Sequence, residues 1–420
     1  MSALPSGATG ALLEIFIFLA GAEAIRYRLR DFGVPQILGE ILFGMALAPA
    51  ALGGVLNGIL GTNLFVVTPV LLAFSDFSVI LLIFAAGLEG GFSSLRRAGG
   101  WAIAAAVAGN LLPFAAGFLV FAHLFGPSVA LLLAVAASST STAVVVSLIR
   151  SEGLGGSSGG QFLLATCAMD DIVGLVLLST ILGLLGGRMT FVAITGSVAV
   201  SVAIWVVVLL ASVAVIPRVF RALGPRGTFN LPFLILFILA AVVTAVGFST
   251  IAGAYIAGLA IAESVAAGRT RATADVLLAV FGALFFVVIG FQFDVSRLAD
   301  PIVIEAGLLL ALIAASGKLA AIFPLASARF PRHPDATMIA LGMVPRGEIG
   351  LIVGAIGISL GILTQQALGA ILVMTLVTVA LGSVLFRRVA AHARDNYLRG
   401  TGTTRPSPTE GPGPPGADGG

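Results

Sequence analysis

The chain has 420 residues, of which 59% are hydrophobic and only 10% are charged, and its mean hydropathy is +1.13. A soluble domain of this size cannot hide that much apolar surface from water. The formal net charge of +3 does not indicate nucleic-acid binding, because the arginines fall in short connections between apolar stretches. The single cysteine, Cys167, excludes an intrachain disulfide and argues against a cysteine metal site.

Apolar stretches of the length needed to cross a membrane, about 17–25 residues, recur along the chain. They do not alternate as the strands of a membrane barrel would, so the predicted fold class is an all-α membrane protein. We predict thirteen transmembrane helices, at about 9–27, 34–52, 68–90, 99–124, 127–149, 158–185, 190–217, 229–247, 249–265, 273–292, 302–327, 335–360 and 364–387.

The arginines support this count and orient the chain. With the N-terminus outside, only Arg188 and Arg297 fall in outer connections, whereas seventeen arginines lie on the inner side. Positive residues concentrate on the cytoplasmic side of membrane proteins, so we expect a cytoplasmic C-terminus. The inner arginines are Arg26, Arg28, Arg30, Arg96, Arg97, Arg150, Arg218, Arg221, Arg226, Arg269, Arg271, Arg329, Arg332, Arg387, Arg388, Arg394 and Arg399. We predict one transmembrane domain over 1–390 and a disordered cytoplasmic tail over 391–420, where Pro, Gly, Ser and Thr dominate.

Two groups of five helices, at about 34–185 and 249–388, are predicted to be inverted repeats. The fourth helix of the first group carries a run of hydroxyl residues from Ser138 to Thr142, and that of the second carries Pro345 and Gly347. Both patterns weaken a helix. Interrupted helices in corresponding positions point to the midplane site of a transporter.

Three of the ionisable side chains inside apolar spans stand out. Asp170 and Asp171 are adjacent in the sixth span, and Lys318, the only lysine among 22 basic residues, lies in the eleventh. Lysine can lose its proton whereas arginine cannot, and ionisable groups at membrane depth are functional candidates. We predict that Lys318 pairs with one aspartate until a cation displaces it. The alternative is a permanent structural ion pair.

Arg346 and Glu348 lie in the interruption of the twelfth span, where they are predicted to neutralise the dipoles of two half-helices. Direct ion binding by these two side chains is the alternative. The glycine-rich run at 153–160 lacks the Lys-Ser/Thr of a phosphate-binding loop. We therefore expect an ion gradient to supply the energy, with no cofactor and no enzymatic activity.

Seven short motifs occur in a specific order, at 35–40, 82–89, 139–143, 169–172, 253–259, 285–290 and 344–351. Together they resemble the monovalent cation:proton antiporter superfamily, most closely the bacterial NapA-like sodium/proton antiporters and the KefB/KefC-related group. The resemblance covers about residues 10–388.

This resemblance implies an NhaA/NapA-like fold in a homodimer of the bacterial inner membrane. A mobile core would comprise about 99–185 and 302–387, and a dimer scaffold about 9–90 and 229–292. Asp171 would be the principal carrier of the cation and the proton, and Asp170 would pair with Lys318. Thr140 and Thr142 would lend oxygens to the ion, so Asp170 and Asp171 would be the ligands of the transported Na⁺.

The sequence and this resemblance together predict a secondary antiporter that exchanges Na⁺, and also Li⁺, for protons by alternating access, and the resemblance implies that the exchange is electrogenic. The expected partners are a monovalent cation, protons, membrane lipid and a second copy of the chain, with no nucleic acid. A K⁺/H⁺ antiporter, a sodium-coupled organic-solute symporter of similar fold, and a membrane sensor or scaffold remain as alternatives.

Overall fold

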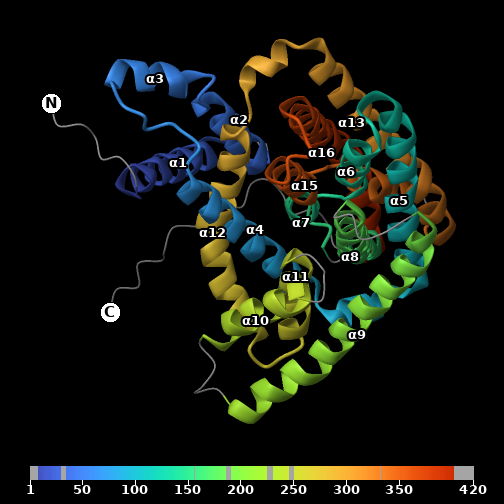
Figure 1. Cartoon of the computed structure of the whole chain (residues 1–420). Coiled ribbons are helices and arrows are strands. Elements are labelled where there is room, and N and C mark those ends of the chain that lie inside the picture. Colours follow the sequence, from blue (N-terminus) through green and yellow to red (C-terminus); the bar gives the residue numbers. More distant parts are fainter. Residues whose placement is uncertain are drawn as a thin grey trace, which may run out of the picture.

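The computed structural model describes residues 8–29, 35–155, 157–185, 191–224, 230–245, 250–331 and 333–401, and all regular structure in these ranges is helical (Figure 1). Each of the thirteen predicted spans falls on one helix or on two helices separated by a break. Within the described ranges, seven helices are long and apolar enough to cross a membrane, or eight if one bent pair counts as a span. The all-α membrane class is confirmed, while the count of thirteen spans and the two inverted repeats stay predictions.

The helices are α1 (Ala8–Leu29), α2 (Gln36–Leu47), α3 (Leu52–Leu60), α4 (Pro69–Gly90), α5 (Phe92–Phe125), α6 (Pro127–Ser138), α7 (Thr142–Ser151), α8 (Ser158–Leu185), α9 (Phe191–Leu223), α10 (Leu231–Ala245), α11 (Thr250–Ala262), α12 (Ala267–Phe291), the 3₁₀ helix η3 (Val295–Ala299), α13 (Pro301–Arg329), α14 (His333–Gly342), α15 (Glu348–Ser359) and α16 (Gln365–Thr401).

The structure differs from the predicted boundaries in two places. The short helix α3 occupies a stretch that is predicted to be a connection, and it meets α2 at a bend of 44°. Paired glycines at its start, Gly53 and Gly54, lower its helix propensity, so the local sequence does not predict a helix there. At the other end, α16 continues to Thr401, so the first part of the tail predicted from 391 is helical. Residues 402–420 lie outside the described residues.

Four helices in one half of the molecule, α2, α4, α11 and α12, pack closely against one another. Glycines make this possible, because a Cβ at Gly44 of α2 would lie 1.9 Å from the carbonyl oxygen of Val287 in α12. The same holds between α4 and α11, where a Cβ at Gly258 would lie 2.2 Å from the Phe84 carbonyl oxygen. Small residues at such crossings let helix backbones touch, which is a common way to associate helices in lipid.

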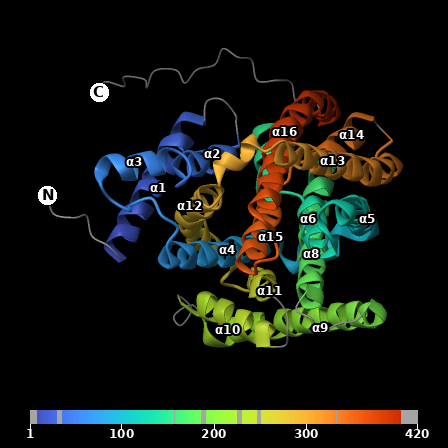
Figure 2. The same ribbon diagram turned by 45° about the horizontal axis from the view of Figure 1, so that its top comes forward.

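The other half contains α5, α6, α8, α13, α14, α15 and α16, which pack around one another. The long helix α9 lies along one edge of the molecule and contacts both α8 and α11, one helix from each half (Figure 2). These two halves correspond in sequence to the predicted mobile core and scaffold. Their relative movement stays a prediction.

Four arginines used to orient the chain, Arg30, Arg188, Arg226 and Arg332, lie outside the described residues. The predicted direction of the termini is therefore still an inference from the sequence.

Candidate ion-binding site

Two interrupted helices meet inside the molecule. α6 ends at Ser138 and α7 begins at Thr142, while α14 ends at Gly342 and α15 begins at Glu348. Hydroxyl side chains compete for backbone hydrogen bonds in the first break, and Pro345 lacks an N–H in the second. The structure therefore shows both of the predicted interruptions.

The two extended segments lie against each other. The Ser141 N–H donates to the Pro345 carbonyl at 2.8 Å, and the Thr140 hydroxyl donates to the Met343 carbonyl at 3.2 Å. A Cβ at Gly347 would lie 2.6 Å from Ser141 Oγ, so a larger residue would press the segments apart. The helix ends at these breaks bring backbone dipoles to one buried place, where they can interact with charge.

Asp170 of α8 is fully buried and receives three donors. Asn110 Nδ2 donates to its Oδ1 at 2.7 Å, and the Thr140 backbone N–H donates to its Oδ2 at 2.8 Å. The Lys318 ammonium, from α13, forms an ion pair with Oδ1. The donors stabilise the ionised carboxylate, because burial of an unpaired charge in this place would cost several kcal/mol.

Asp171, the neighbouring residue, is in a different environment. Its Oδ2 accepts a hydrogen bond from the Thr142 hydroxyl at 2.9 Å. No ion pair of Asp171 occurs within the described part of the chain, and 6% of the residue is exposed. The two adjacent carboxylates are therefore not equivalent: Asp170 is held by a lysine and two further donors, whereas Asp171 is bound by a neutral hydroxyl.

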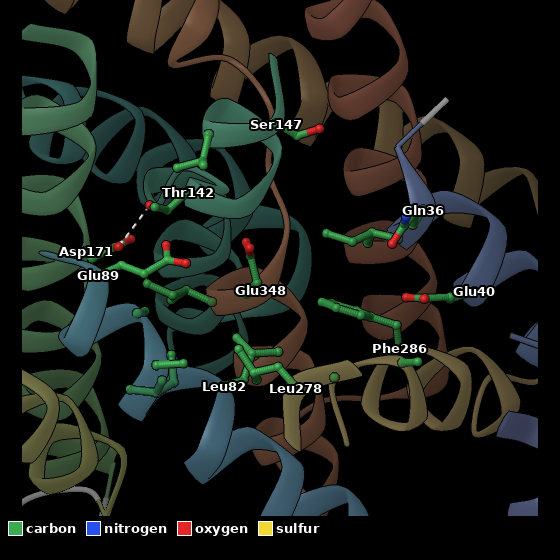
Figure 3. A pocket seen from close by; sticks show the side chains of 18 of the residues that line it. Gln36, Glu40, Leu82, Glu89, Thr142, Ser147, Asp171, Leu278, Phe286 and Glu348 are labelled. Atoms are coloured by element: carbon green, nitrogen blue, oxygen red, sulfur yellow. Dashed lines mark hydrogen bonds between the residues drawn. The ribbon is translucent and has the colours of Figure 1, made fainter. Parts of the chain in front are cut away.

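Two cavities meet at Asp171. The first has a volume of about 450 Å³, and its walls include Glu40, Glu89, Asp171, Glu348 and Thr142. Figure 3 shows Asp171, Glu89 and Glu348 facing one part of this space, with Glu40 on the opposite wall. Arg26 also lines this cavity and lies 3.8 Å from Glu40, so four carboxylates face one arginine, and the excess of negative charge favours cations.

The second cavity is larger, about 1340 Å³, and shares Asp171, Thr142 and Glu89 with the first. Its walls also include Arg271 and Arg329, which lie at ends of α12 and α13 that the sequence predicts to be cytoplasmic. Asp171 is thus reached from the predicted inner side, while Asp170 is not in the lining of either cavity.

Arg346 is fully buried at the break between α14 and α15. Its Nη1 donates to the Met343 carbonyl at 3.1 Å and to the Thr140 hydroxyl at 3.3 Å, and its Nη2 donates to the Ala314 carbonyl at 2.6 Å. Glu348 begins α15, where a negative charge is favourable beside the helix N-terminus. These contacts agree with the predicted charge compensation, which stays a prediction as a role in transport.

All seven predicted site residues lie in this one region: Asp170, Asp171, Thr140, Thr142, Lys318, Arg346 and Glu348. Sequence reasoning missed Asn110 and the position of Tyr255, whose hydroxyl donates to the Ala168 carbonyl of α8 at 3.2 Å and which lines the smaller cavity. Asn110 is the one amide side chain in the apolar run 101–122, so the rule that singled out the aspartates could have found it.

Crossed discontinuous helices with ionisable side chains at the crossing define the class of the protein as a multi-pass membrane transporter. The chain belongs to the sodium/hydrogen exchanger family: the family model described as sodium/hydrogen exchanger, transmembrane, matches residues 15–391. This confirms the resemblance to the monovalent cation:proton antiporters and the prediction that the protein is a transporter and not an enzyme.

Several relatives match nearly the whole chain. The Na⁺/H⁺-K⁺ antiporter GerN of Bacillus cereus is 29% identical over 377 residues, which cover 88% of this chain and 92% of GerN. The high-affinity Na⁺/H⁺ antiporter NhaS3 of Synechocystis sp. is 27% identical and covers 92% and 91% of the two chains. The structure of the sodium proton antiporter MjNhaP1 from Methanocaldococcus jannaschii superposes with a TM-score of 0.72 at 16% identity, covering 93% of this chain and 99% of that one. This last likeness supports the fold alone.

Proposed function

We propose that the protein exchanges Na⁺, and also Li⁺, for protons by alternating access, and that the exchange is electrogenic. The observation that carries this proposal is that the two neighbouring carboxylates differ in their access to the cavities and in their bonding partners. Asp171 lines both cavities and accepts one neutral hydrogen bond, whereas Asp170 is enclosed and paired with Lys318. An accessible carboxylate beside a lysine-bound one is suited to bind a cation or a proton in turn.

In the proposed cycle, a dehydrated cation binds at Asp171, with oxygens from Thr140 and Thr142 and the carboxylate of Asp170. A positive ion there weakens the attraction between Asp170 and Lys318, so the ammonium leaves and can lose its proton. When the cation is released, Asp171 and Lys318 take up protons. A charge at the bilayer centre costs about 2.5–3.5 kcal/mol on insertion scales. The mobile helices should therefore change conformation most readily when a bound cation or proton neutralises the charge of the site.

The cavities support the proposal that this structure is the inward-facing conformation. Arg271 and Arg329 line the larger cavity, and both belong to predicted cytoplasmic connections. Exchange would require a second conformation that opens Asp171 to the other side. The proposed mobile part is 99–185 with 302–387, and the proposed scaffold is 9–90 with 229–292.

We further propose a homodimer in a bacterial inner membrane, with lipid around it, the N-terminus outside and the C-terminus cytoplasmic. No resident cofactor is proposed, and the sodium ion is the transported substrate. The relative GerN is named a Na⁺/H⁺-K⁺ antiporter, and this supports K⁺/H⁺ exchange as the second candidate.

The test is cation-dependent proton movement in proteoliposomes containing the purified protein, with Na⁺, Li⁺ and K⁺ supplied in turn. We expect Asp171→Asn to abolish exchange, because the amide cannot alternate between a proton and a cation. Asp76→Asn is the matched control, since Asp76 is an exposed carboxylate in the membrane helix α4 and lines neither cavity. Sodium movement driven by a pH gradient in a folded Asp171→Asn protein would refute the assignment, and solute-dependent sodium uptake would favour the symporter.

A further inference from the structure

A side chain outside the predicted ion site contacts the buried ion pair directly. Asn110 of α5 is fully buried, and its Nδ2 donates to Asp170 Oδ1 at 2.7 Å. The Lys318 ammonium binds the same carboxylate oxygen. An amide and an ammonium from two different helices therefore converge on one atom.

The surroundings determine which way the amide of Asn110 points. Besides Asp170 Oδ1, its Nδ2 faces the Ala106 carbonyl at 3.1 Å and the Asp170 carbonyl at 3.4 Å. All three neighbours are acceptors for an ionised Asp170, so exchanging the amide nitrogen and oxygen would set acceptor against acceptor. The Asn110 amide therefore acts as a donor toward Asp170.

This orientation leaves the amide oxygen in an unusual position. Asn110 Oδ1 is buried and accepts no hydrogen bond within the described part of the chain. A buried acceptor without a donor costs about 1–3 kcal/mol, so such an atom requires a reason.

Lys318 passes close to this part of α5. A Cβ at Gly109 would lie 3.3 Å from Lys318 Cδ, and a Cβ at Gly317 would lie 2.9 Å from Pro113 Cβ. The glycines thus let α5 and α13 approach, and the lysine stem lies beside the residue that precedes Asn110. An ammonium that leaves Asp170 by a change of side-chain rotamer remains near the amide.

We propose that Asn110 is a positioning residue for the Asp170–Lys318 pair: its nitrogen holds Asp170, and its oxygen accepts the Lys318 ammonium when a cation displaces it. This inference rests on the proposed exchange function and extends it. Asn110 lowers the cost of breaking the ion pair, because the displaced ammonium keeps a hydrogen-bond acceptor. The amide itself carries no proton and binds no cation in this scheme.

The experiment is a double-mutant cycle in proteoliposomes with the wild type, Asn110→Leu, Lys318→Gln and the double variant. Leucine approximates the shape of asparagine without its polar atoms. We expect Asn110→Leu to raise the apparent KM for Na⁺ about ten- to hundred-fold in the wild type, with a smaller effect on kcat, since a hydrogen bond to a charged group is lost. In the Lys318→Gln background, where no ammonium has to be displaced, the same substitution should raise KM at most about threefold.

An equal rise of KM in both backgrounds, or no rise in the wild type, would overturn the inference. If Asn110→Leu does not yield folded protein, Asn110→Ser enters the cycle under the same criteria. Thermal unfolding of the four proteins gives a readout independent of transport, and coupling between Asn110 and Lys318 is expected there too. Absence of exchange by the wild type would refute the proposed function, whereas exchange with additive effects on KM and on unfolding would refute the role of Asn110 alone.

Discussion

Replacing Lys318 by glutamine should remove the dependence of exchange on membrane potential while exchange itself continues. Two groups beside the site can take up and release protons in the proposed cycle, Asp171 and Lys318, whereas Asp170 is held by three donors. If both carry a proton, each Na⁺ moves against two protons, and one net charge crosses the membrane. Without the lysine only the Asp171 proton remains, and no net charge crosses.

The size of the effect follows from this difference of one charge. One elementary charge moved across 100 mV is worth about 2.3 kcal/mol, and about 1.36 kcal/mol corresponds to a factor of ten. The equilibrium Na⁺ ratio of the wild type should therefore change about fifty-fold for each 100 mV, and that of Lys318→Gln should not change.

The Na⁺ gradient at which net sodium flux in proteoliposomes stops, measured with the potential clamped by a potassium gradient and an ionophore, gives this ratio. Lys318→Arg is the informative companion variant, because its guanidinium keeps the positive charge but cannot release a proton. Loss of voltage dependence in both variants identifies proton release by Lys318 as the cause. A Lys318→Gln protein that still responds about fifty-fold per 100 mV would refute the reasoning.

Two further substitutions test the site and the packing around it. Thr142→Val removes the hydroxyl that donates to Asp171, so the apparent affinity for Na⁺ should fall about tenfold in the same flux assay; Thr166→Val, which loses only a bond within α8, should leave it unchanged. Gly258→Ala places a Cβ 2.2 Å from a backbone oxygen of α4, and thermal unfolding should show a loss of about 1–3 kcal/mol. Gly268→Ala, where a Cβ meets no atom within 4 Å, is the control, and an equal loss there would contradict the packing argument.

Much of the architecture could be predicted because a membrane restricts the possible structures. Apolar length identifies spans, and each predicted span falls on a helix or a broken pair. The break at Pro345 could be predicted from a missing N–H. The short helix α3 could not, since Gly53 and Gly54 weaken its local signal and its formation depends on the surrounding structure.

The sequence singled out seven residues that the structure brings into one region, but it did not show how they are arranged there, and their roles in transport stay predictions. The only lysine of the chain and two adjacent aspartates, all inside apolar spans, predicted an ion pair, and the structure shows Lys318 beside Asp170. Adjacent aspartates, however, look alike in a sequence, and only the resemblance to known antiporters suggested which one the lysine would bind. Asn110 was missed because an uncharged amide in an apolar span is a weaker signal than a charge. Its partner, Asp170, is also 60 positions away in the chain, so no local pattern links the two residues.

The glycine contacts of α2 with α12 and of α4 with α11 have a mechanical consequence. Where main chain lies directly on main chain, no intervening layer of side chains can rearrange, so sliding would require whole helices to lift apart. These four helices should move together as one rigid body. Any opening of Asp171 toward the opposite water compartment must then be accommodated by displacement of the bundle that contains the two crossed breaks.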